Sequence, residues 1–281
     1  MKTFTEPDKL QKWAEGRRMA GRKIALVPTM GYLHEGHLSL IAAARKKGAD
    51  EIVVSIFVNP IQFGPREDFA KYPRDEKADL EKCKKAGATA VFFPTPANMY
   101  MKNHSVYMSE NELGKSLCGA RRPGHFRGVC TVVAKLFNLV HPHYAIFGQK
   151  DYQQQAIIRR MVRDMNFDVK IVTVPIVRES SGLALSSRNV YLTDEQRYQA
   201  LALSRSLKAA QRDVKLEGVV DWKPYRTRMV RVLRRSKLNV DYVEAVDPET
   251  LVPVSRLSHG KAVILLAAYC GGTRLIDNAL M

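Results

Sequence analysis

Short apolar runs alternate with amphipathic segments along residues 20–178 of this chain. The runs are rich in valine, isoleucine and other residues typical of buried strands, and the segments between them repeat their apolar positions with the period of a helix. Strands of nearly continuous apolar character, separated by helices, are typical of a parallel sheet covered on both faces. The pattern therefore predicts a doubly wound α/β (Rossmann-like) domain. Its expected strands are 23–30, 51–59, 88–94, 144–151 and 169–177, and its expected helices are 37–48, 74–87, 131–141 and 153–166.

The pattern changes after about residue 180. Thr193 and Gln196 form a capping-box sequence, which predicts the start of a helix that ends near residue 218. A second helix is expected over about 222–236, and two further apolar runs predict strands of a small sheet. We therefore expect a Rossmann-like domain over 1–180 and a smaller α+β domain over 181–281, with strands at 240–247 and 261–278 and a turn at Gly271-Gly272.

Composition narrows the class of protein further. The chain has 281 residues, 46% of them hydrophobic, so it is long enough to bury a large core. Its four cysteines are scattered and form no C-x-x-C pair, which argues against a disulfide framework or a zinc knuckle. No secretory signal is evident at the start, and the longest apolar run, 262–270, is far shorter than the roughly 20 residues of a membrane helix. We expect a cytoplasmic protein that does not contact a membrane.

The charge balance favours an anionic ligand. Lysine and arginine number 45 against 28 acidic residues, for a net charge of +17. The excess is dense over 226–237, where Arg228, Arg231 and Arg235 share one stripe of an expected helix. A solvated basic face and a nucleic-acid contact both fit this stripe, and we favour the solvated face.

The segment "PTMGYLHEGH", residues 28–37, carries the strongest chemical signal. It follows the first expected strand, and in an open α/β sheet ligands bind at the carboxyl ends of the strands. The first N–H groups of a helix have no intrahelical partner and favour an anion. His34 and His37 lie three residues apart, so both imidazoles are expected to donate to one phosphate. Two alternatives remain: a metal-binding pair, for which no third ligand has convincing spacing, and two histidines that cap a turn.

Three further segments carry polar side chains, two of them near strand ends and one, "LSSRN", at the expected domain junction. Asp151 of "FGQKDYQQ" suits a ribose hydroxyl or a magnesium ion, and Lys150 beside it suits a phosphate. "LSSRN", residues 185–189, places two hydroxyls and a guanidinium together as donors for a triphosphate. In "FVNPIQF", the neutral amide of Gln62 suits hydroxyls or a carboxylate. A polar loop, a helix cap and a simple turn are the structural alternatives for the three segments.

A fourth segment, "RRPGHFRGV" at 121–129, sets arginines and a histidine around glycines. A flexible anion-contacting loop and a dimer contact both fit it, and the sequence does not decide between them.

H-x-G-H after the first strand, with a Ser/Arg-rich loop late in the fold, resembles the nucleotidyltransferase superfamily, which includes class I aminoacyl-tRNA synthetases. The full set of segments narrows this resemblance to the pantothenate synthetase family, over nearly the whole chain. The segments occur in the order typical of that family: "PTMGYLHEGH", "SIFVNPIQF", "YPRD", "RPGHFRGV", "FGQKDYQQ" and "LSSRN".

The resemblance implies an ATP-dependent ligase that condenses (R)-pantoate with β-alanine through a pantoyl adenylate and releases AMP and diphosphate. It further implies a magnesium requirement and a cytoplasmic homodimer whose second domain closes over the ATP site. By matching position, Gln62 and Gln154 bind pantoate, Gln62 also lies at the β-alanine site, and no residue is assigned to the metal. The nucleotide site comprises Met30, Gly31, Tyr32, Leu33, His34, Glu35, Gly36, His37, Gly148, Gln149, Lys150, Asp151, Val177, Leu185, Ser186, Ser187 and Arg188.

The chemistry of such a ligase assigns roles to the basic residues. A carboxylate is a poor electrophile, and attack on the α-phosphate of ATP converts it into a mixed anhydride with AMP as leaving group. The protein mainly positions the reactants and stabilises charge on the phosphates. His34, His37, Lys150 and Arg188 are the catalytic candidates, and in the resemblance His37 is a proton donor.

The sequence departs from the family pattern at two positions. Leu185 stands where methionine is usual, which is a mild apolar change. Ser181 stands where an aspartate is more frequent, which removes a charge near the phosphate loop.

Two other classes of function compete with the ligase. One is a nucleotidyltransferase that joins an adenylyl group to a phosphorylated substrate and stops there. The other is a non-enzymatic RNA-binding protein that uses the basic stripe at 226–237, and it predicts a salt-sensitive affinity. A class I tRNA synthetase is disfavoured because the late loop lacks the two lysines usual in those enzymes. We expect ATP, (R)-pantoate and β-alanine as partners, and nucleic acid is not expected.

Overall fold

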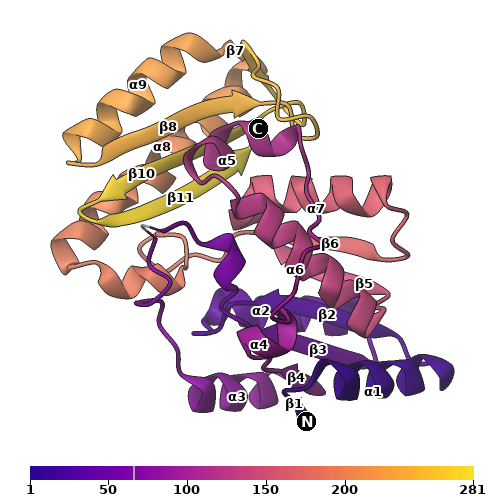
Figure 1. Ribbon diagram of the computed structural model, residues 1–281. Helices are drawn as coiled ribbons and strands as arrows, with labels where there is room; N and C mark the ends of the chain where they lie inside the picture. The colour runs from indigo at the N-terminus through magenta and orange to yellow at the C-terminus, as the bar shows by residue number, and fades with distance from the viewer. Residues whose placement is uncertain (66) are drawn as a thin grey trace. The chain divides into compact units, whose positions relative to one another are not determined.

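The computed structural model describes residues 1–65 and 67–281 (Figure 1). The chain divides into two compact units. Unit 1 comprises Met1–Gly148 and Ile157–Pro175, and unit 2 comprises Gln149–Ala156 and Ile176–Met281. The expected boundary between two domains at residue 180, and the expected closure of the second domain over a nucleotide, stay predictions.

Unit 1 is built on a six-stranded sheet in the order β1-β4-β3-β2-β5-β6, and all of its paired strands are parallel. β2 and β3 lie in the middle of the sheet, and each carries a run of buried residues because helices cover both faces. The predicted doubly wound parallel sheet is confirmed. Its strands are β1 Lys2–Phe4, β2 Ile24–Thr29, β3 Glu51–Ile56, β4 Ala90–Phe92, β5 Tyr144–Gly148 and β6 Lys170–Val174.

Helices connect successive strands of this sheet. α2 packs on α3 and on the central strands, and α1 packs against α6. Gly48 and Gly87 follow α2 and α3 with positive φ, which stops both helices as the sequence predicts. The helices are α1 Pro7–Met19, α2 Glu35–Lys46, α3 Glu76–Lys85, α4 Pro96–Met99, α5 Leu117–Arg121, α6 His125–Val140 and α7 Tyr152–Asp164, with 3₁₀ turns at Pro60–Gln62 (η1), Leu113–Lys115 (η2) and Gln149–Asp151 (η3).

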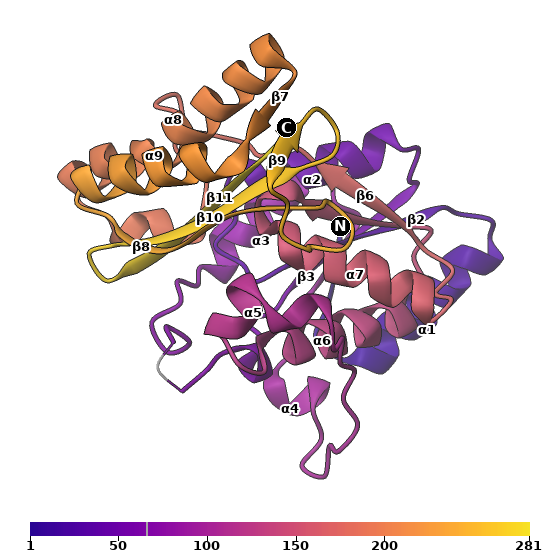
Figure 2. The same cartoon turned by 90° about the horizontal axis from the view of Figure 1, so that it is seen from above.

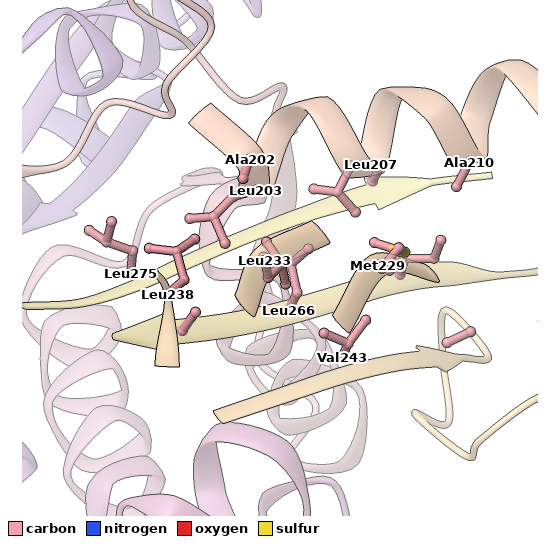
Figure 3. Packing of buried hydrophobic residues seen from close by; sticks show 14 of the residues in the cluster. Ala202, Leu203, Leu207, Ala210, Met229, Leu233, Leu238, Val243, Leu266 and Leu275 are labelled. Atoms are coloured by element: carbon pink, nitrogen blue, oxygen red, sulfur yellow. The ribbon is translucent and has the colours of Figure 1, made fainter. Parts of the chain in front are cut away.

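Unit 2 contains a three-stranded antiparallel sheet in the order β11-β10-β8, covered by α8 and α9, which lie side by side (Figure 2). The core between helices and sheet is aliphatic, with Leu207, Leu233 and Leu266 fully buried (Figure 3). The predicted smaller α+β element is confirmed, as is the capping box of Thr193 and Gln196. The elements are η4 Ser187–Tyr191, α8 Asp194–Glu217, β7 Val219–Asp221, α9 Trp222–Arg235, β8 Asn239–Val246, β9 Arg256–Ser258, β10 Val263–Cys270 and β11 Thr273–Leu280.

The structure argues against one of the two alternatives for residues 121–129, a flexible loop. α6 begins at His125, and His125, Phe126, Gly128 and Val129 are buried in it. The described residues contain no helix with both the length and the apolar character needed to cross a membrane.

Candidate active site

The two histidines of the H-x-G-H segment lie at the start of α2, where the chain turns after β2. His34 is the N-cap, and its Nδ1 accepts a hydrogen bond from the Gly36 N–H at 3.1 Å. The Nδ1 of His37 accepts one from the His34 N–H at 3.2 Å, and the ring centroids lie 4.1 Å apart. The two side chains therefore cap the helix as a reciprocal pair, which is the structural alternative raised by the sequence.

The capping hydrogen bonds also determine which nitrogen of each ring can donate to a ligand. When Nδ1 of a neutral imidazole accepts a hydrogen bond, the proton lies on Nε2. His34 and His37 therefore each carry an Nε2–H donor, beside the positive end of the α2 dipole. Capping and anion binding are compatible, because each role uses a different nitrogen. Among the described residues, no group of three or more histidine, cysteine, aspartate or glutamate side chains is placed to hold a metal ion.

Asp79 of α3 fixes the turn before these histidines. Its carboxylate, only 1% exposed, accepts hydrogen bonds from the Tyr32 and Leu33 N–H groups, both at 2.7 Å. Burial raises the pKa of Asp79, and the two N–H donors oppose that rise. Gly31 lies against this carboxylate with φ of 84°, and an added Cβ there would come 2.9 Å from a methyl of Ile56. The backbone path of the H-x-G-H turn thus depends on Asp79, which sequence reasoning missed.

Gln62 lies in η1, directly after β3, and is 7% exposed. A chain of hydrogen bonds fixes which way its amide faces. The Gly128 carbonyl only accepts, so the Asn59 amide must present Nδ2 to it, at 3.1 Å. The same Nδ2 donates to Gln62 Oε1 at 2.9 Å, while Tyr100 donates its hydroxyl to Asn59 Oδ1 at 2.8 Å. Burial raises the pKa of Tyr100, which keeps that hydroxyl protonated.

The orientation of the amide has a chemical consequence. Because Gln62 Oε1 is already engaged with Asn59, the amide presents Nε2 on its other side, 3.2 Å from the sulfur of Met30. Gln62 therefore offers donors rather than acceptors, which suits the oxygens of a hydroxy acid. The structure brings Met30 and Gln62 together, although 32 residues separate them in the chain.

In unit 2, the β11 residue Asn278 holds the turn that carries Lys150. Its Nδ2 donates to the carbonyls of Gln149 and Lys150 at 3.0 and 2.9 Å, and its Oδ1 accepts from Gln149 Nε2 at 3.1 Å. Asn278 is 2% exposed. Asp151 is exposed at the end of this turn, and Gln154 is half-buried in the first part of α7. The predicted polar groups of 149–151 thus lie on a turn anchored by a side chain 127 or more positions away.

The serine-arginine loop of unit 2 has its own supports. Asn189, 4% exposed, donates Nδ2 to the Ala184 carbonyl and to Glu179 Oε1, both at 3.1 Å. Arg197 donates from Nη1 to both oxygens of the same Glu179 carboxylate, at 2.9 and 3.1 Å, and from Nη2 to the Asn189 carbonyl at 3.0 Å. Ser187 begins the 3₁₀ turn η4, with Ser186 as its N-cap accepting from the Arg188 N–H at 3.3 Å.

Val177, Leu185 and Ser181 lie on the same segment of unit 2. The Leu185 N–H donates to the Val177 carbonyl at 3.0 Å, so the two predicted nucleotide residues pair through their backbones. The Ser181 hydroxyl accepts from the Leu183 N–H at 3.4 Å. The serine hydroxyl therefore makes, through a long hydrogen bond, the kind of turn contact that an aspartate makes with a charged oxygen.

The predicted nucleotide residues divide between the units. Unit 1 holds Met30 through His37 and Gly148 at the end of β5, and unit 2 holds Gln149 through Asp151, Val177 and Leu185 through Arg188. Within each unit the residues lie on loops at strand or helix ends, and buried polar side chains fix those loops.

Comparison with known proteins decides the family. A sequence model described as "Pantoate-beta-alanine ligase" matches residues 2–280. The chain belongs to the pantoate-β-alanine ligase family. The family resemblance predicted from the sequence is thus confirmed.

Relatives within the pantoate-β-alanine ligase family match over their full lengths. A pantothenate synthetase of Thermotoga petrophila is 51% identical over 282 residues, covering 100% of this chain and 100% of its own. The crystal structure of pantothenate synthetase from Thermus thermophilus is 43% identical with a TM-score of 0.91, over 100% of this chain and 99% of its own. A pantoate-β-alanine ligase from Francisella tularensis, solved with β-γ ATP and β-alanine, is 31% identical with a TM-score of 0.82, over 100% of this chain and 97% of its own.

Proposed function

We propose that this chain condenses (R)-pantoate with β-alanine at the expense of ATP, and releases AMP and diphosphate through a pantoyl adenylate. The observation that carries the proposal is the match to the pantoate-β-alanine ligase family over residues 2–280. A relative that was solved with β-γ ATP and β-alanine supports ATP and β-alanine as substrates. The polar loops of the two units supply donors for an anionic substrate, as this reaction requires.

His34 and His37 are proposed to hold phosphate oxygens through their Nε2–H groups. The pantoate carboxylate attacks the α-phosphate, and charge grows on the phosphate oxygens and the departing diphosphate. Fixed donors placed where charge develops lower the barrier without reorganising at the moment of reaction. The capping bonds at Nδ1 orient both rings before any ligand arrives. Lys150 and Arg188 are proposed to act on the same charges as cations.

The remaining nucleotide residues are proposed to shape the ATP site by their backbones and short side chains. Gly31 and Gly36 admit close approach of a ligand, and the hydroxyls of the serine-arginine loop donate to phosphate. Closure of the smaller domain over ATP would exclude water from the adenylate. The proposed set is Met30 to His37, Gly148 to Asp151, Val177 and Leu185 to Arg188.

Gln62 and Gln154 are proposed to bind pantoate. The amide of Gln62 presents Nε2, which matches the carboxylate and hydroxyl oxygens of a small hydroxy acid. The same donor suits the carboxylate of β-alanine, which is why Gln62 is assigned to both substrates. A neutral donor avoids fixing the pantoate carboxylate as an ion pair away from the α-phosphate.

Magnesium is proposed as the companion of ATP. This ion prefers oxygen ligands, keeps several waters, and is usually bound through one or two carboxylates together with substrate phosphates. The exposed Asp151 carboxylate fits such a site, and the described residues offer no larger acidic cluster. When bound, the ion neutralises part of the phosphate charge. We further propose a cytoplasmic homodimer, a state that sedimentation analysis of the purified chain tests directly.

A product assay tests the function. The purified chain is incubated with ATP, magnesium, (R)-pantoate and β-alanine, and AMP, diphosphate and pantothenate are quantified. We expect the three products in equal amounts, and labelled diphosphate should exchange into ATP with pantoate alone. Exchange that needs β-alanine would contradict a free-standing adenylate step.

The same assay separates the rival functions. A nucleotidyltransferase that stops at adenylyl transfer releases diphosphate without AMP. An RNA-binding protein shows salt-dependent RNA affinity and no pantoate-dependent turnover. Absence of amide product with all substrates present would refute the proposal.

A further inference from the structure

The segment "RRPGHFRGV" forms a hydrogen-bonded chain that ends on the residue proposed to bind pantoate. Arg122 donates from Nε and Nη2 to the two oxygens of Glu67, both at 2.7 Å. Its third nitrogen, Nη1, lies 2.8 Å from His125 Nε2, and His125 Nδ1 lies 2.8 Å from the carbonyl oxygen of Gln62. We call Glu67, Arg122 and His125 the Arg122 latch.

The protonation of the latch follows from its two ends. Arginine only donates, so His125 must accept at Nε2, and the Gln62 carbonyl only accepts, so His125 must donate from Nδ1. His125 is therefore neutral with its proton on Nδ1. This is the opposite tautomer to that of His34 and His37, whose protons lie on Nε2.

The three residues of the latch are largely buried, which distinguishes them from a chance pairing of charged side chains on the surface. The His125 residue is 7% exposed, and the Arg122 and Glu67 side chains are 18% and 23% exposed. Burial acts to raise the pKa of Glu67, but the hydrogen bonds and charge of Arg122 outweigh it and hold that pKa below its ordinary value. Because Nε and Nη2 of Arg122 donate to Glu67 and Nη1 donates to His125, all three of its nitrogens are engaged within the protein, and Arg122 acts here as a structural donor.

Close packing of α6 against η1 also restricts the backbone of Gln62. α6 approaches η1 at Gly128, where an added Cβ would come 2.5 Å from the Ile61 carbonyl oxygen and 2.7 Å from the Gln62 nitrogen. The Gly128 carbonyl also orients Asn59, which in turn orients the Gln62 amide. The backbone of Gln62 is thus fixed at its nitrogen by packing and at its carbonyl by the latch.

We propose that Glu67, Arg122 and His125 are positioning residues that fix the Gln62 backbone and thereby set the affinity for the hydroxy acid. The proposal rests on the proposed function of Gln62 as a pantoate ligand. It gives the "RRPGHFRGV" segment a role that neither a flexible anion loop nor a dimer contact supplies. The latch contacts no substrate, and its effect on substrate binding passes through Gln62.

Matched variants at His125 test the positioning role. In His125→Asn the amide nitrogen takes the place of Nδ1 and still donates to the Gln62 carbonyl, whereas His125→Phe keeps the ring and loses both nitrogens. We expect His125→Phe to raise KM for pantoate about tenfold, because a buried acceptor is left unpaired. His125→Asn should recover most of that loss. The kcat, and KM for ATP, should change less than about twofold in both variants.

Arg122→Gln and Arg127→Gln form a second pair that removes the same charge from neighbouring positions. Arg127 is exposed and stacks on Tyr107, with 4.7 Å between its Cζ and the ring centroid, outside the latch. Arg122→Gln should raise KM for pantoate, and Arg127→Gln should not. Equal effects of the two variants, or a parallel loss in kcat, ATP affinity and melting temperature, would show a merely structural role and overturn the proposal.

Two further measurements distinguish a failure of the latch proposal from a failure of the proposed function. If wild-type turnover does not depend on pantoate, the proposed function fails; if Gln62→Ala weakens pantoate use while the latch variants do not, only the latch proposal fails. In wild-type protein with ¹⁵N-labelled histidine, the signal that disappears in His125→Asn should have a protonated Nδ1. A protonated Nε2, or both nitrogens protonated at neutral pH, would overturn the latch even if the Phe variant does not fold.

Discussion

The H-x-G-H turn of unit 1 and the serine-arginine loop of unit 2 are held by different kinds of interaction. In unit 1, the short carboxylate of Asp79 accepts two backbone N–H groups of the H-x-G-H turn at 2.7 Å. In unit 2, two arginines support the serine-arginine segment: Arg178 forks onto Asp277 with two nitrogens at 2.7 and 2.8 Å, and Arg197 donates from Nη1 to both oxygens of Glu179 at 2.9 and 3.1 Å. The backbone of the H-x-G-H turn is held directly by a short side chain, whereas the serine-arginine loop is held largely through long charged side chains.

This difference has consequences for rigidity. A carboxylate bonded to backbone N–H groups orders a side chain with few rotatable bonds, whereas an arginine fork must order a long one. Ion pairs near the surface are also screened by salt, and the Arg197–Glu179 pair is 35% and 25% exposed. We therefore expect the H-x-G-H turn to be preorganised without ligand and the serine-arginine loop to gain order when phosphate binds.

The largest effect is expected at His37. In His37→Asn the short amide can still accept from the His34 N–H, so the cap is kept, but no donor remains at the place of Nε2. Loss of one preorganised donor costs about 10²–10³ in turnover. The free energy of unfolding should change by less than about 1 kcal/mol, as expected when a cap is preserved. Steady-state kinetics and chemical denaturation measure the two effects.

Lys150→Met supplies the matching variant in unit 2, and it should also lower turnover without unfolding the chain. Full activity in either variant, or a loss that follows thermal stability, would remove that residue from the proposed catalytic set.

Asp79→Asn should give the next largest effect. An amide offers one acceptor oxygen, so one of the Tyr32 and Leu33 N–H groups would face an N–H₂ group and remain unpaired. An unpaired buried donor costs about 1–3 kcal/mol, and we expect a loss of unfolding free energy in that range together with reduced turnover. Asp75→Asn is the control, because Asp75 is an exposed N-cap of the same helix, and asparagine caps as well as aspartate. Equal stability of the two variants would contradict a fixed H-x-G-H turn.

The sequence predicts the parallel sheet well because its signal is local. β2 and β3 carry continuous apolar runs, and each precedes a helix with its own stop signal, so neither depends on distant partners for recognition. The segment before residue 20 has no such run, and β1 with its helix α1 was not predicted. β1 is short and pairs only with β4, at the edge of the sheet.

The residues of the candidate site likewise divide into those with a local sequence signal and those that depend on distant contacts. The H-x-G-H, Q-K-D and S-S-R-N segments are contiguous in sequence, and the sequence therefore identifies them as candidates. Asp79, Asn278 and Arg122 support these segments or Gln62 from distant positions, and nothing in a helical or strand period marks them. Asp79 lies among other charged residues of α3, and only the fold shows that it is buried and binds the H-x-G-H turn.

In unit 2, Arg178→Lys tests the arginine fork on Asp277. Lysine keeps one charge but cannot fork onto both oxygens of Asp277, whose side chain is 2% exposed. We expect a loss of about 1–2 kcal/mol in unfolding free energy, larger than for most surface pairs. Arg256→Lys is the control, because Arg256 and Asp221 lie 3.6 Å apart and are 66% and 77% exposed. A change at Arg178 no larger than at Arg256 would show that the fork does not hold the loop.

A smaller, pH-dependent effect is expected at Glu67. Its pKa is held below the ordinary value of 4.5, so the ionised form stabilises the fold. That contribution is present above pH 4.5 and is lost as pH falls through the lowered pKa. The stability difference between wild type and Glu67→Gln should therefore be largest near neutral pH and shrink as pH falls below 4.5 and through the lowered pKa. A difference that grows on acidification would contradict the ion pair with Arg122.

The smallest effect is expected at Ser181, in the loop that we propose to be the less ordered. Its hydroxyl accepts from the Leu183 N–H at 3.4 Å, which is a long bond for a turn. In Ser181→Asp a charged oxygen replaces the hydroxyl, and a charge-assisted bond to the same N–H is shorter and stronger. We expect a gain of roughly 0.3–0.5 kcal/mol in unfolding free energy and less than about a twofold change in KM for ATP, since an exposed side chain adds little. Ser180→Asp, an exposed neighbour, adds the same charge without the turn contact and should be neutral. If both variants weaken ATP binding equally, the added charge repels phosphate at either position. That result would contradict the expectation that the Ser181 turn contact determines how ordered this loop is.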